Sequence, residues 1–359
     1  MTKIEDARLQ DVVRRKEEGI DVVLKGNVQA RETTTLLECV HLVHNALPET
    51  DMEDIDLSVS FLGKKLRTPV VVDSMTGGAP KAERINGLLA EVAEEKGFAM
   101  GLGSQRAGLL SSEMAATYSV ARKNAPTAFL FANIGAAQLA RGFSVKDAER
   151  LVEMIDADAL AVHLNPLQEV VQPEGEPSFK GVLAAIKKLC LELSVPVIVK
   201  EVGAGISREV AIRLEYAGVR AINVAGAGGT SWAAVEAHRA SERQMQSKAD
   251  LGLLFWDWGI PTAAALIEVK KAVKLPVIAS GGLRNGLEVC KCLSLGAEAC
   301  GMARPMLENA AKGRDELEAF ADQTVKELRA AMFVTGAKSV GDIRRVRKVI
   351  TPPLTYWVN

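Results

Sequence analysis

The heptapeptide PVIVKEV at residues 196–202 combines a short, β-branched apolar run with a charged end. Runs of this length and composition are typical of parallel strands that are buried on both faces of a sheet. Seven further runs of the same kind occur along the chain, at residues 69–77 (PVVVDSMTG), 99–105 (AMGLGSQ), 128–134 (AFLFANI), 159–165 (ALAVHLN), 221–226 (AINVAG), 276–282 (PVIASGG) and 299–305 (ACGMARP). The sequence therefore predicts eight buried parallel strands.

Helical patterns separate these runs, at residues 81–96, 145–155, 179–193, 207–216, 263–273 and 287–295. Ser144 is a suitable N-cap for the second helix, and Gly97 is suited to end the first. Most successive runs begin roughly 25–35 residues apart, which is the size of one βα unit. Eight such units in 359 residues favour an α/β fold with one closed (β/α)8 TIM barrel over two doubly wound domains.

Two stretches interrupt this rhythm. Residues 1–68 precede the first strand, and their segment 57–66 (LSVSFLGKKL) is predicted to form a hairpin that caps the bottom of the barrel. A long insertion follows strand six, begins GAGGTSW and contains the polar run 236–250. Within it, residues 227–262 form either a lid over the catalytic end or a surface excursion. The predicted organisation is therefore an N-terminal extension (1–68), a barrel (69–335) and a C-terminal tail (336–359).

The composition excludes several classes of partner. Lys and Arg number 44 against 45 Asp and Glu, and aromatic residues make up only 4%. A nearly neutral chain with few aromatic residues is a poor candidate for binding nucleic acid or an acidic membrane surface, so any anion site must be local. The N-terminus lacks an apolar signal region, and five cysteines without C-x-x-C spacing indicate reduced thiols. We therefore expect a cytoplasmic protein without a membrane span.

Chemistry in such a barrel takes place at the carboxyl ends of the strands. All eight predicted strand ends carry polar or glycine residues, which cost free energy at half-buried positions unless they are satisfied. In strand order they are Ser74-Met75-Thr76-Gly77-Gly78; Gly103-Ser104-Gln105-Arg106; Asn133; His163 and Asn165, with Gln168 and Glu169; Lys200-Glu201; Gly226 to Thr230; Ser280-Gly281-Gly282-Leu283-Arg284; and Ala303-Arg304. These ends are the candidate site.

The last two strand ends predict a phosphate site. A Gly-Gly turn that runs into a helix exposes backbone N–H groups to an anion, and barrels often bind phosphate after strands seven and eight. The sequences 280–284 and 303–304 fit this pattern and indicate a phosphorylated cofactor. The alternative is that Gly281 and Gly282 only form a tight corner.

Other strand ends offer charge and hydrogen bonds. Lys200 suits either a Schiff base or a positive charge beside an anionic cofactor ring. His163 and Asn165 are two residues apart on a strand and point to the same side, and Gln168 and Glu169 follow in the next turn. No second His or Cys lies at zinc-ligand spacing, so the Glu169 carboxylate is better suited to hold Mg²⁺ against a substrate phosphate.

Basic residues supply local positive charge. Arg15 and Lys16 near the N-terminus, together with Arg106 after strand two, can hold a diphosphate. From these residues alone, however, a solvated helix face is the favoured interpretation of residues 14–16.

Taken together, five motifs resemble the type 2 isopentenyl diphosphate isomerases, a family of FMN-dependent (β/α)8 enzymes of isoprenoid synthesis, in their archaeal form. They are MTGG (75–78), GSQR (103–106), HLNPLQE (163–169) with QPEG (172–175), GAGGTSW (226–232) and WDWGIPT (256–262). The resemblance covers nearly the whole chain. It implies interconversion of isopentenyl and dimethylallyl diphosphate, without net oxidation, by reduced FMN acting as acid and base. It also implies NADPH as reductant, Mg²⁺, and a homo-oligomer, either a tetramer or an octamer.

The resemblance also implies residue roles. Gln168 would lie beside the reacting carbons, with His163 and Asn165 shaping the catalytic pocket and Lys200 stabilising the anionic flavin. Glu169 would hold Mg²⁺. Substrate diphosphate contacts would come from Arg15, Lys16, Ser104, Gln105, Arg106 and Gln168. FMN contacts would come from Ser74, Met75, Thr76, Gly77, Ser104, Asn133, Lys200, Thr230, Gly281, Gly282, Leu283, Arg284, Ala303 and Arg304.

One position departs from the family pattern. The family places a histidine three residues after its N-terminal Arg-Lys pair, where this chain has Gly19. The change is compatible with weaker diphosphate binding, with different docking of the N-terminal segment, or with a paralogue of altered substrate.

Three rival functions remain. The first is an FMN-dependent barrel oxidoreductase such as a hydroxyacid oxidase. The hydroxyacid oxidases use a histidine base late in the chain, and no histidine follows residue 276 here. The IMP dehydrogenase class needs a cysteine in the loop that here is GAGGTSW. A non-catalytic flavin-binding protein has only Gly19 in its favour.

Overall fold

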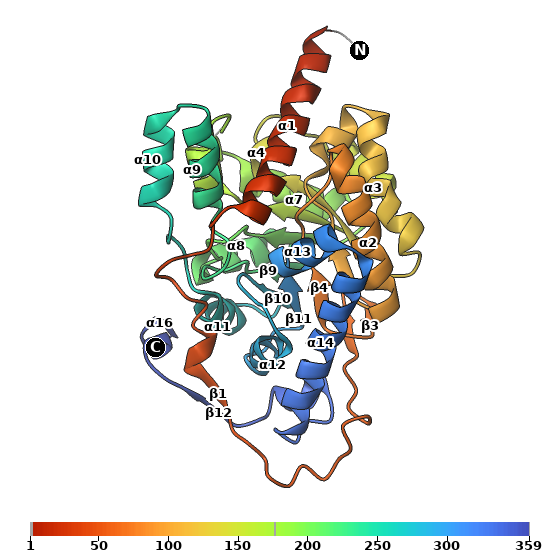
Figure 1. Ribbon diagram of the computed structural model, residues 1–359, viewed down its shortest axis with the longest axis vertical. Coiled ribbons are helices and arrows are strands. Elements are labelled where there is room, and N and C mark those ends of the chain that lie inside the picture. The colour runs from red at the N-terminus through yellow and green to blue at the C-terminus, as the bar shows by residue number, and fades with distance from the viewer. Residues whose placement is uncertain (1–2, 176, 359) are drawn as a thin grey trace.

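The computed structural model describes residues 3–175 and 177–358 and contains the predicted closed barrel of eight parallel strands (Figure 1). Around the ring the strands follow the order β10-β11-β4-β5-β6-β7-β8-β9, so the first and last barrel strands are hydrogen-bonded to each other. The strands are β4 (Val70–Val72), β5 (Ala99–Gly101), β6 (Leu130–Gly135), β7 (Ala159–His163), β8 (Val197–Lys200), β9 (Ala221–Asn223), β10 (Val277–Ser280) and β11 (Ala299–Met302). The eight predicted strands and the fold class are confirmed.

Helices surround this ring. The six predicted ones are α2 (Pro80–Lys96), α5 (Val145–Met154), α7 (Val182–Glu192), α8 (Arg208–Tyr216), α11 (Thr262–Ala272) and α12 (Gly286–Ser294). Their termini follow local chemistry. The Ser144 hydroxyl accepts the Asp147 N–H at 3.2 Å and the Asp147 carboxylate accepts the Ser144 N–H at 3.0 Å, a reciprocal capping box. Gly97 ends α2 at φ 68°, a conformation that favours glycine.

Further elements were not predicted. They are α1 (Lys3–Lys25), α3 (Ser112–Asn124), α4 (Ala136–Leu139), α6 (Pro166–Val171), α9 (Trp232–Glu242), α10 (Gln246–Leu254), α13 (Arg304–Lys312), α14 (Arg314–Phe333), α15 (Val340–Ile343) and α16 (Leu354–Val358), the 3₁₀ turns η1 (Leu37–Cys39) and η2 (Gln105–Leu109), and the antiparallel pair β1 (Val40–Leu42) and β12 (Lys348–Ile350). Across the described residues, none of the helices combines the length and apolar character that a membrane span requires.

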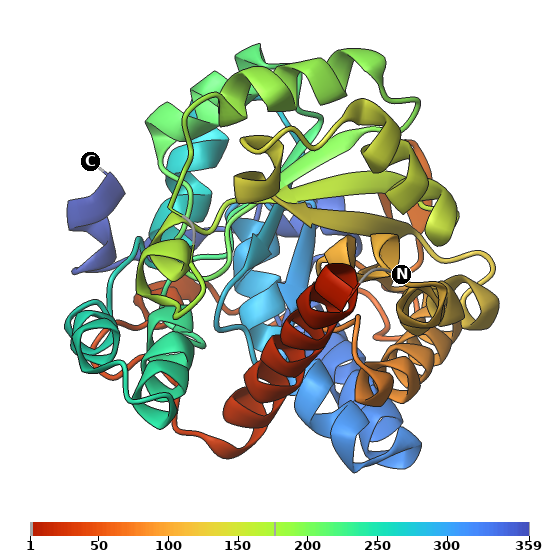
Figure 2. The same cartoon turned by 90° about the horizontal axis from the view of Figure 1, so that it is seen from above.

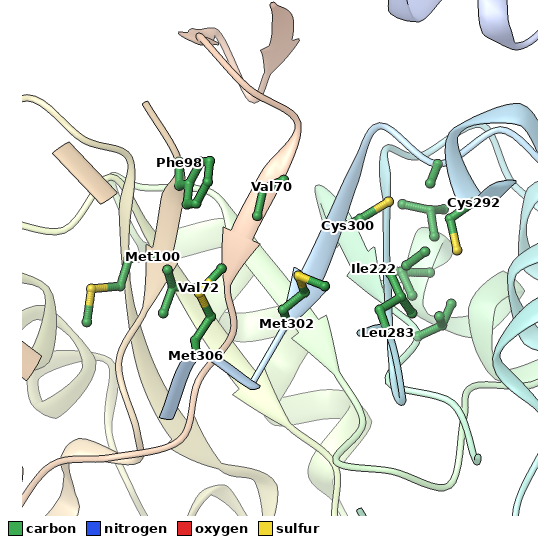
Figure 3. Close-up of a cluster of buried hydrophobic side chains, with 14 of the residues drawn as sticks. Val70, Val72, Phe98, Met100, Ile222, Leu283, Cys292, Cys300, Met302 and Met306 are labelled. Carbon is green, nitrogen blue, oxygen red and sulfur yellow. The ribbon is translucent and has the colours of Figure 1, made fainter. Parts of the chain in front are cut away.

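Successive residues on each barrel strand alternate between two hydrophobic layers. On β4, Val70 and Val72 join the outer layer between strands and helices, whereas Val71 joins the inner layer. Figure 3 shows part of the outer layer, where Met302 and Met306 pack near Val72. This alternation has the period of two that a strand imposes on its side chains. It fixes which residue of each strand faces the barrel axis.

The predicted hairpin closes the lower end of the barrel. Strand β2 (Val59–Phe61) pairs antiparallel with β3 (Lys64–Leu66). The Phe61 and Leu66 side chains join the inner layer, and the Phe61 ring meets the Phe129 ring edge-to-face at a centroid distance of 5.4 Å. Because the lower end is filled with apolar side chains, polar chemistry is confined to the upper end.

The N-terminal helix lies at that upper end. Seen from above in Figure 2, α1 crosses in front of the barrel strands, with α9 beside it. The chain after α1 joins the insertion that follows strand six: Gln29 forms a β-bridge with Thr230, and Trp256 Nε1 donates to the Gln29 carbonyl at 2.9 Å. The insertion therefore folds as the helical pair α9 and α10 and is fastened to the N-terminal extension.

Candidate active site

A cavity of about 540 Å³ opens at the carboxyl ends of the barrel strands. Every strand end contributes to its wall, and α1 and α9 contribute residues from above. Its volume lies within the range usual for sites that bind small molecules and cofactors. The barrel thus places one ligand-sized chamber where the sequence predicted the chemistry.

The floor of the cavity is built on a layer of polar side chains that continues the inward face of six of the eight strands, and all of these side chains except Asn223 line the cavity. Each polar residue follows an apolar residue of the inner layer by two positions. The pairs are Val71 and Asp73, Phe131 and Asn133, Ala161 and His163, Ile198 and Lys200, Ala221 and Asn223, and Ile278 and Ser280. His163, Lys200 and Asn223 are direct register partners on β7, β8 and β9. The period of two that builds the apolar layer therefore also aims these polar groups at the barrel axis.

Lys200 is paired rather than isolated. Its Nζ lies 3.5 Å from Asp73 Oδ1, and both side chains are buried, with exposed fractions of 5% and 4%. Asn223 Nδ2 donates to Asp73 Oδ2 at 3.0 Å, and the Ser280 hydroxyl donates to Asn223 Oδ1 at 2.6 Å. Sequence reasoning missed Asp73 and Asn223. The period of two along each strand, counted from inward-facing Val71 and Ala221, would have identified both residues.

His163 is held in one neutral form. Its Nδ1 lies 2.7 Å from Asn133 Oδ1, and Asn133 Nδ2 donates to the Leu102 carbonyl at 2.9 Å. Since the Asn133 oxygen can only accept, His163 Nδ1 carries the proton and Nε2 keeps a lone pair. Burial, followed by the positive charges of Lys200, Lys16 and Arg15, lowers the pKa of His163 to about 3. This residue therefore acts as a neutral hydrogen-bonding group at neutral pH.

Four side chains form a hydrogen-bonded chain along one wall. Asn165 Nδ2 donates to Gln168 Oε1 at 3.1 Å and to Glu169 Oε1 at 3.0 Å. Gln168 Nε2 in turn donates to Glu236 Oε1 on α9 at 2.8 Å. These bonds fix the orientation of both amides, and hence the face that Gln168 presents to a ligand. The cluster predicted from HLNPLQE is thus assembled, with Glu236 as a member that sequence reasoning missed.

Two buried polar atoms in the described residues have no hydrogen-bond partner, namely the Ser74 hydroxyl and Asn165 Oδ1. Both residues line the cavity. A buried polar group without a partner costs about 1–3 kcal/mol, so such atoms are usually satisfied by something that binds. One lies on the side predicted to hold the cofactor and the other on the side predicted to hold the substrate.

Positive charge enters the cavity from α1. Arg15 and Lys16 line it, whereas the neighbouring Arg14 is exposed, so the predicted solvated face applies only to Arg14. Lys16 Nζ donates to the Ser104 carbonyl at 2.8 Å. Desolvation, assisted by Arg15, lowers the pKa of Lys16 to about 7. Gly19 also lines the cavity, and a Cβ placed there would meet nothing within 4 Å.

The glycines after strands six and seven pack backbone against backbone. A Cβ on Gly281, which has a φ of +103°, would lie 2.1 Å from the Gly226 carbonyl oxygen. One on Gly229 would lie 2.5 Å from the Gly282 nitrogen. Close backbone packing at the corner therefore explains why Gly281 and Gly229 are glycine. Both loops still line the cavity, so the corner also brings backbone to the ligand.

Helix α9 brings a buried ion cluster to the rim. Arg239, which is 1% exposed, contacts Glu18, Glu174 and Glu236 at 3.0, 2.9 and 2.5 Å. Burial raises the pKa of Glu236, while Arg239 and the Gln168 hydrogen bond act in the opposite direction. The sequence showed only a polar run here, since nothing in it indicated that α1 packs against α9.

The structure corrects one predicted site residue. Gln105 is fully buried outside the cavity wall, with Nε2 donating to the Leu151 carbonyl at 3.0 Å and Oε1 accepting the Asn133 N–H at 2.9 Å. With both ends engaged by the barrel, it supports Asn133 and cannot also contact a diphosphate. The other predicted site residues all line the cavity. They include Glu169, Thr230, Arg284 and Arg304, the last of which donates to Glu308 at 2.7 Å.

Comparison with known proteins gives close relatives over nearly the whole chain. The sequence pattern of the FMN-dependent dehydrogenase family matches residues 162–349. A protein of Methanothermobacter thermautotrophicus named isopentenyl-diphosphate delta-isomerase is 48% identical over 96% of this chain and 95% of its own length. Proteins of the same name from Halobacterium salinarum and Pyrococcus furiosus are 48% and 46% identical, over 98% and 97% of this chain and 96% and 89% of their own lengths.

Solved structures of mandelate oxidase share the fold. A mutant form of that enzyme with a monooxide FMN adduct has a TM-score of 0.63 at 19% identity, over 96% of this chain and 100% of that chain. The same mutant with benzaldehyde gives a TM-score of 0.65 at 20% identity, over 96% and 98%. At this level of identity the likeness establishes the barrel alone.

Proposed function

The chain belongs to the FMN-dependent, type 2 isopentenyl-diphosphate delta-isomerase family, and from this premise we propose how its cavity interconverts isopentenyl diphosphate and dimethylallyl diphosphate. The observation that carries the proposal is that a polar barrel floor and the cations of α1 line one and the same cavity. The reaction adds one proton to a terminal carbon and removes a proton from a different carbon, so no net electrons pass to the substrate.

The residues at the floor and the glycine loops fit FMN. The unpartnered Ser74 hydroxyl and the buried ammonium of Lys200 offer a donor and a positive charge to a polar, electron-rich ring. Gly281, Gly282, Arg284 and the start of α13 at Arg304 offer backbone N–H groups and cations to a phosphate. The remaining proposed contacts are Met75, Thr76, Gly77, Ser104, Asn133, Thr230, Leu283 and Ala303. When bound in its reduced form, FMN supplies the acid and base that exchange protons with the substrate.

The residues of α1 and of the segment after β5 fit the diphosphate substrate. Arg15, Lys16 and Arg106 neutralise the anion, and Ser104 adds a hydrogen-bonding group. No group of three or more His, Cys, Asp or Glu side chains in the described part of the chain could hold a metal alone. A Mg²⁺ ion held by Glu169 together with substrate phosphate oxygens agrees with the known preference of this ion.

The amide wall positions the hydrocarbon end of the substrate. Asn165 and Glu236 hold Gln168 from both sides, so its side chain keeps one face toward the cavity. Neutral His163 contributes Nε2 as an acceptor and adds no positive charge beside Lys200. Together these groups orient the double bond and exclude water. Holding the reacting atoms in the right geometry lowers the barrier to reaction.

Two finer features complete the proposal. NADPH acts as the reductant that brings the flavin to its active state, and the chain assembles as a homo-oligomer, a tetramer or an octamer. Both rest on the family relationship. NADPH oxidation under anaerobic conditions and light scattering of the purified protein test them separately.

The test uses the full chain loaded with FMN. We expect the dithionite- or NADPH-reduced protein to convert isopentenyl diphosphate to dimethylallyl diphosphate anaerobically with Mg²⁺. Absence of product while the absorption spectrum shows reduced flavin would refute the proposal. A second assay tests the competing oxidase class by mixing the oxidised, FMN-loaded protein with mandelate. Reduction of the flavin by mandelate would favour that class instead.

A further inference from the structure

Arg239 is the most enclosed charged side chain at the rim of the cavity, and it contacts three carboxylates on three separate segments. Its Nη1 lies 2.5 Å from Glu236 Oε2, and its Nη2 lies 2.9 Å from Glu174 Oε1 and 3.0 Å from Glu18 Oε2. A rigid planar fork of five N–H donors holds several carboxylates in fixed directions, whereas the compact ammonium of a lysine has three donors and no such fork. Arg239 is therefore a junction between α9, the loop after α6 and α1.

One arm of this junction leads to the reacting end of the cavity. Glu236 accepts from Arg239 through Oε2 and from Gln168 through Oε1, so each of its oxygens has one partner. Gln168 is held on its other side by Asn165. If Arg239 were absent, Glu236 would remain buried without its counter-charge and would lose the contact that fixes its rotamer. The orientation of Gln168 depends on that rotamer.

The other arm leads to the anion-binding helix. Glu18 lies on α1 directly before Gly19 and two residues after Lys16. Besides Arg239, Glu18 contacts Arg243, which lies 2.8 Å from it and also pairs with Glu174. Near the end of α1, the Gln29 bridge to Thr230 gives a second attachment. The Arg239–Glu18 pair therefore sets how Lys16 and Arg15 lie over the cavity.

We propose that Arg239 is a positioning residue that couples docking of α1 over the substrate diphosphate to the orientation of Gln168 beside the substrate carbons. The proposal rests on the roles assigned above to α1 and Gln168. A tether of α1 alone would affect substrate binding, whereas a support for Glu236 alone would affect turnover. Arg239 contacts both and therefore affects both.

Neighbouring residues separate these effects. Arg243 touches Glu18 and Glu174, and its ion-pair partners in the described residues do not include Glu236. Glu18→Gln and Arg243→Met therefore weaken the α1 arm and leave the Glu236 arm in place. Arg122 is a matched control: it is also largely buried and pairs with Asp158 at 3.0 Å, but it does not line the cavity. Arg122→Met reports what loss of a largely buried ion pair does to stability alone.

The experiment measures kcat and KM of the FMN-loaded enzyme together with hydrogen–deuterium exchange of α1. For Glu18→Gln and Arg243→Met we expect faster exchange in residues 10–25 and a raised KM, with kcat within about twofold of wild type. For Arg239→Met we expect the same faster exchange and raised KM, and in addition a kcat lowered about 10- to 100-fold, the scale of a small misplacement near the reacting atoms. Arg239→Lys, which keeps the charge but not the fork, should give a smaller loss of kcat and serves if the methionine variant does not fold.

Two results would overturn the proposal. One is a kcat for Arg239→Met no lower than that for Arg122→Met. The other is unchanged hydrogen–deuterium exchange of α1 in Glu18→Gln, Arg243→Met and Arg239→Met. Failure of the proposed function is a separate outcome, because the wild type itself would then make no product. The exchange measurement still tests the tether in that case.

Discussion

The ammonium of Lys200 on β8 lies 3.5 Å from the carboxylate of Asp73 on the loop that follows β4, and these strands are four positions apart in the ring of eight. The two side chains therefore meet across the barrel, above the apolar layer that includes Val71 and Ile198. A buried ion pair that joins opposite strands both fixes the cavity floor and keeps a positive charge there.

Replacing Lys200 tests that arrangement. We expect Lys200→Met to lower the free energy of unfolding by about 3 kcal/mol, because it leaves the Asp73 carboxylate buried without its partner. FMN affinity should fall as well. In the double variant Lys200→Met/Asp73→Asn the stability should largely return while FMN affinity does not. Urea unfolding and FMN titration by fluorescence measure the two quantities, and recovery of both would show that Lys200 serves only the fold.

We expect Lys16 to make substrate capture depend on pH. Its pKa is lowered to about 7 by desolvation and by Arg15, so the ammonium is present below that pH and lost above it. Since kcat/KM reports the ionisation of the free enzyme, it should fall as pH rises through about 7. In Lys16→Arg the charge persists at all accessible pH values, and this limb should disappear. A profile identical in the two proteins would mean that another group titrates there.

Gly19 offers a test of the departure from the family pattern. A Cβ at this position meets no neighbour within 4 Å, and a glycine inside a helix costs about 0.5–1 kcal/mol relative to alanine. Gly19→Ala should therefore raise stability by up to about 1 kcal/mol without changing KM. Gly19→His should give a similar fold and a lower KM for the diphosphate. An unchanged KM in the histidine variant would show that the imidazole is not needed here.

Glu169 should govern the requirement for metal. We expect EDTA to abolish turnover and added Mg²⁺ to restore it. In Glu169→Gln, which keeps the size of the side chain, the Mg²⁺ concentration for half-maximal rate should rise at least about tenfold, because a carboxylate is lost from the ion. FMN binding should not change. The same Mg²⁺ dependence in wild type and variant would place the ion elsewhere.

Phe61 should affect stability without affecting chemistry. It is 1% exposed at the closed end of the barrel and packs against Phe129. Truncation of a buried aromatic side chain costs about 3–5 kcal/mol, and we expect Phe61→Ala to lose that amount in urea unfolding. The KM should stay that of the wild type at temperatures where the variant is folded. A large change in KM would mean that the two ends of the barrel are coupled.

The barrel and most of its polar floor could be predicted because strands obey a local rule. Short apolar runs mark the strands, and the period of two assigns Val71 to the inner layer and then Asp73 to the cavity. Applied to every strand, the same count would have identified Asp73 and Asn223 in advance. Lys200 and His163 stand out in sequence only because they are charged or aromatic at a strand end.

Contacts between segments that are distant in sequence could not be predicted in this way. Gln105 lies within a motif of the site, yet its orientation depends on Leu151 and Asn133 from other units of the barrel. Glu18 and Arg239 are separated by 221 positions, and nothing local to either residue indicates the other. The positions of the N-terminal helix and the insertion are properties of packing between surfaces.

The pairing of β1 with β12 bears on how the chain is made. Val40 is the register partner of Ile350, so β1 lacks its partner strand until residues 348–350 have been synthesised (Figure 1). At ribosomal rates of about 5–20 residues per second, that delay lasts roughly 15–60 s. Ring closure between β4 and β11 has to wait almost as long, because Val70 pairs with Cys300. In a nascent chain of this protein, β4 therefore keeps an unpaired edge until residues 299–302 have been made, and β1 stays unpaired until residues 348–350 follow.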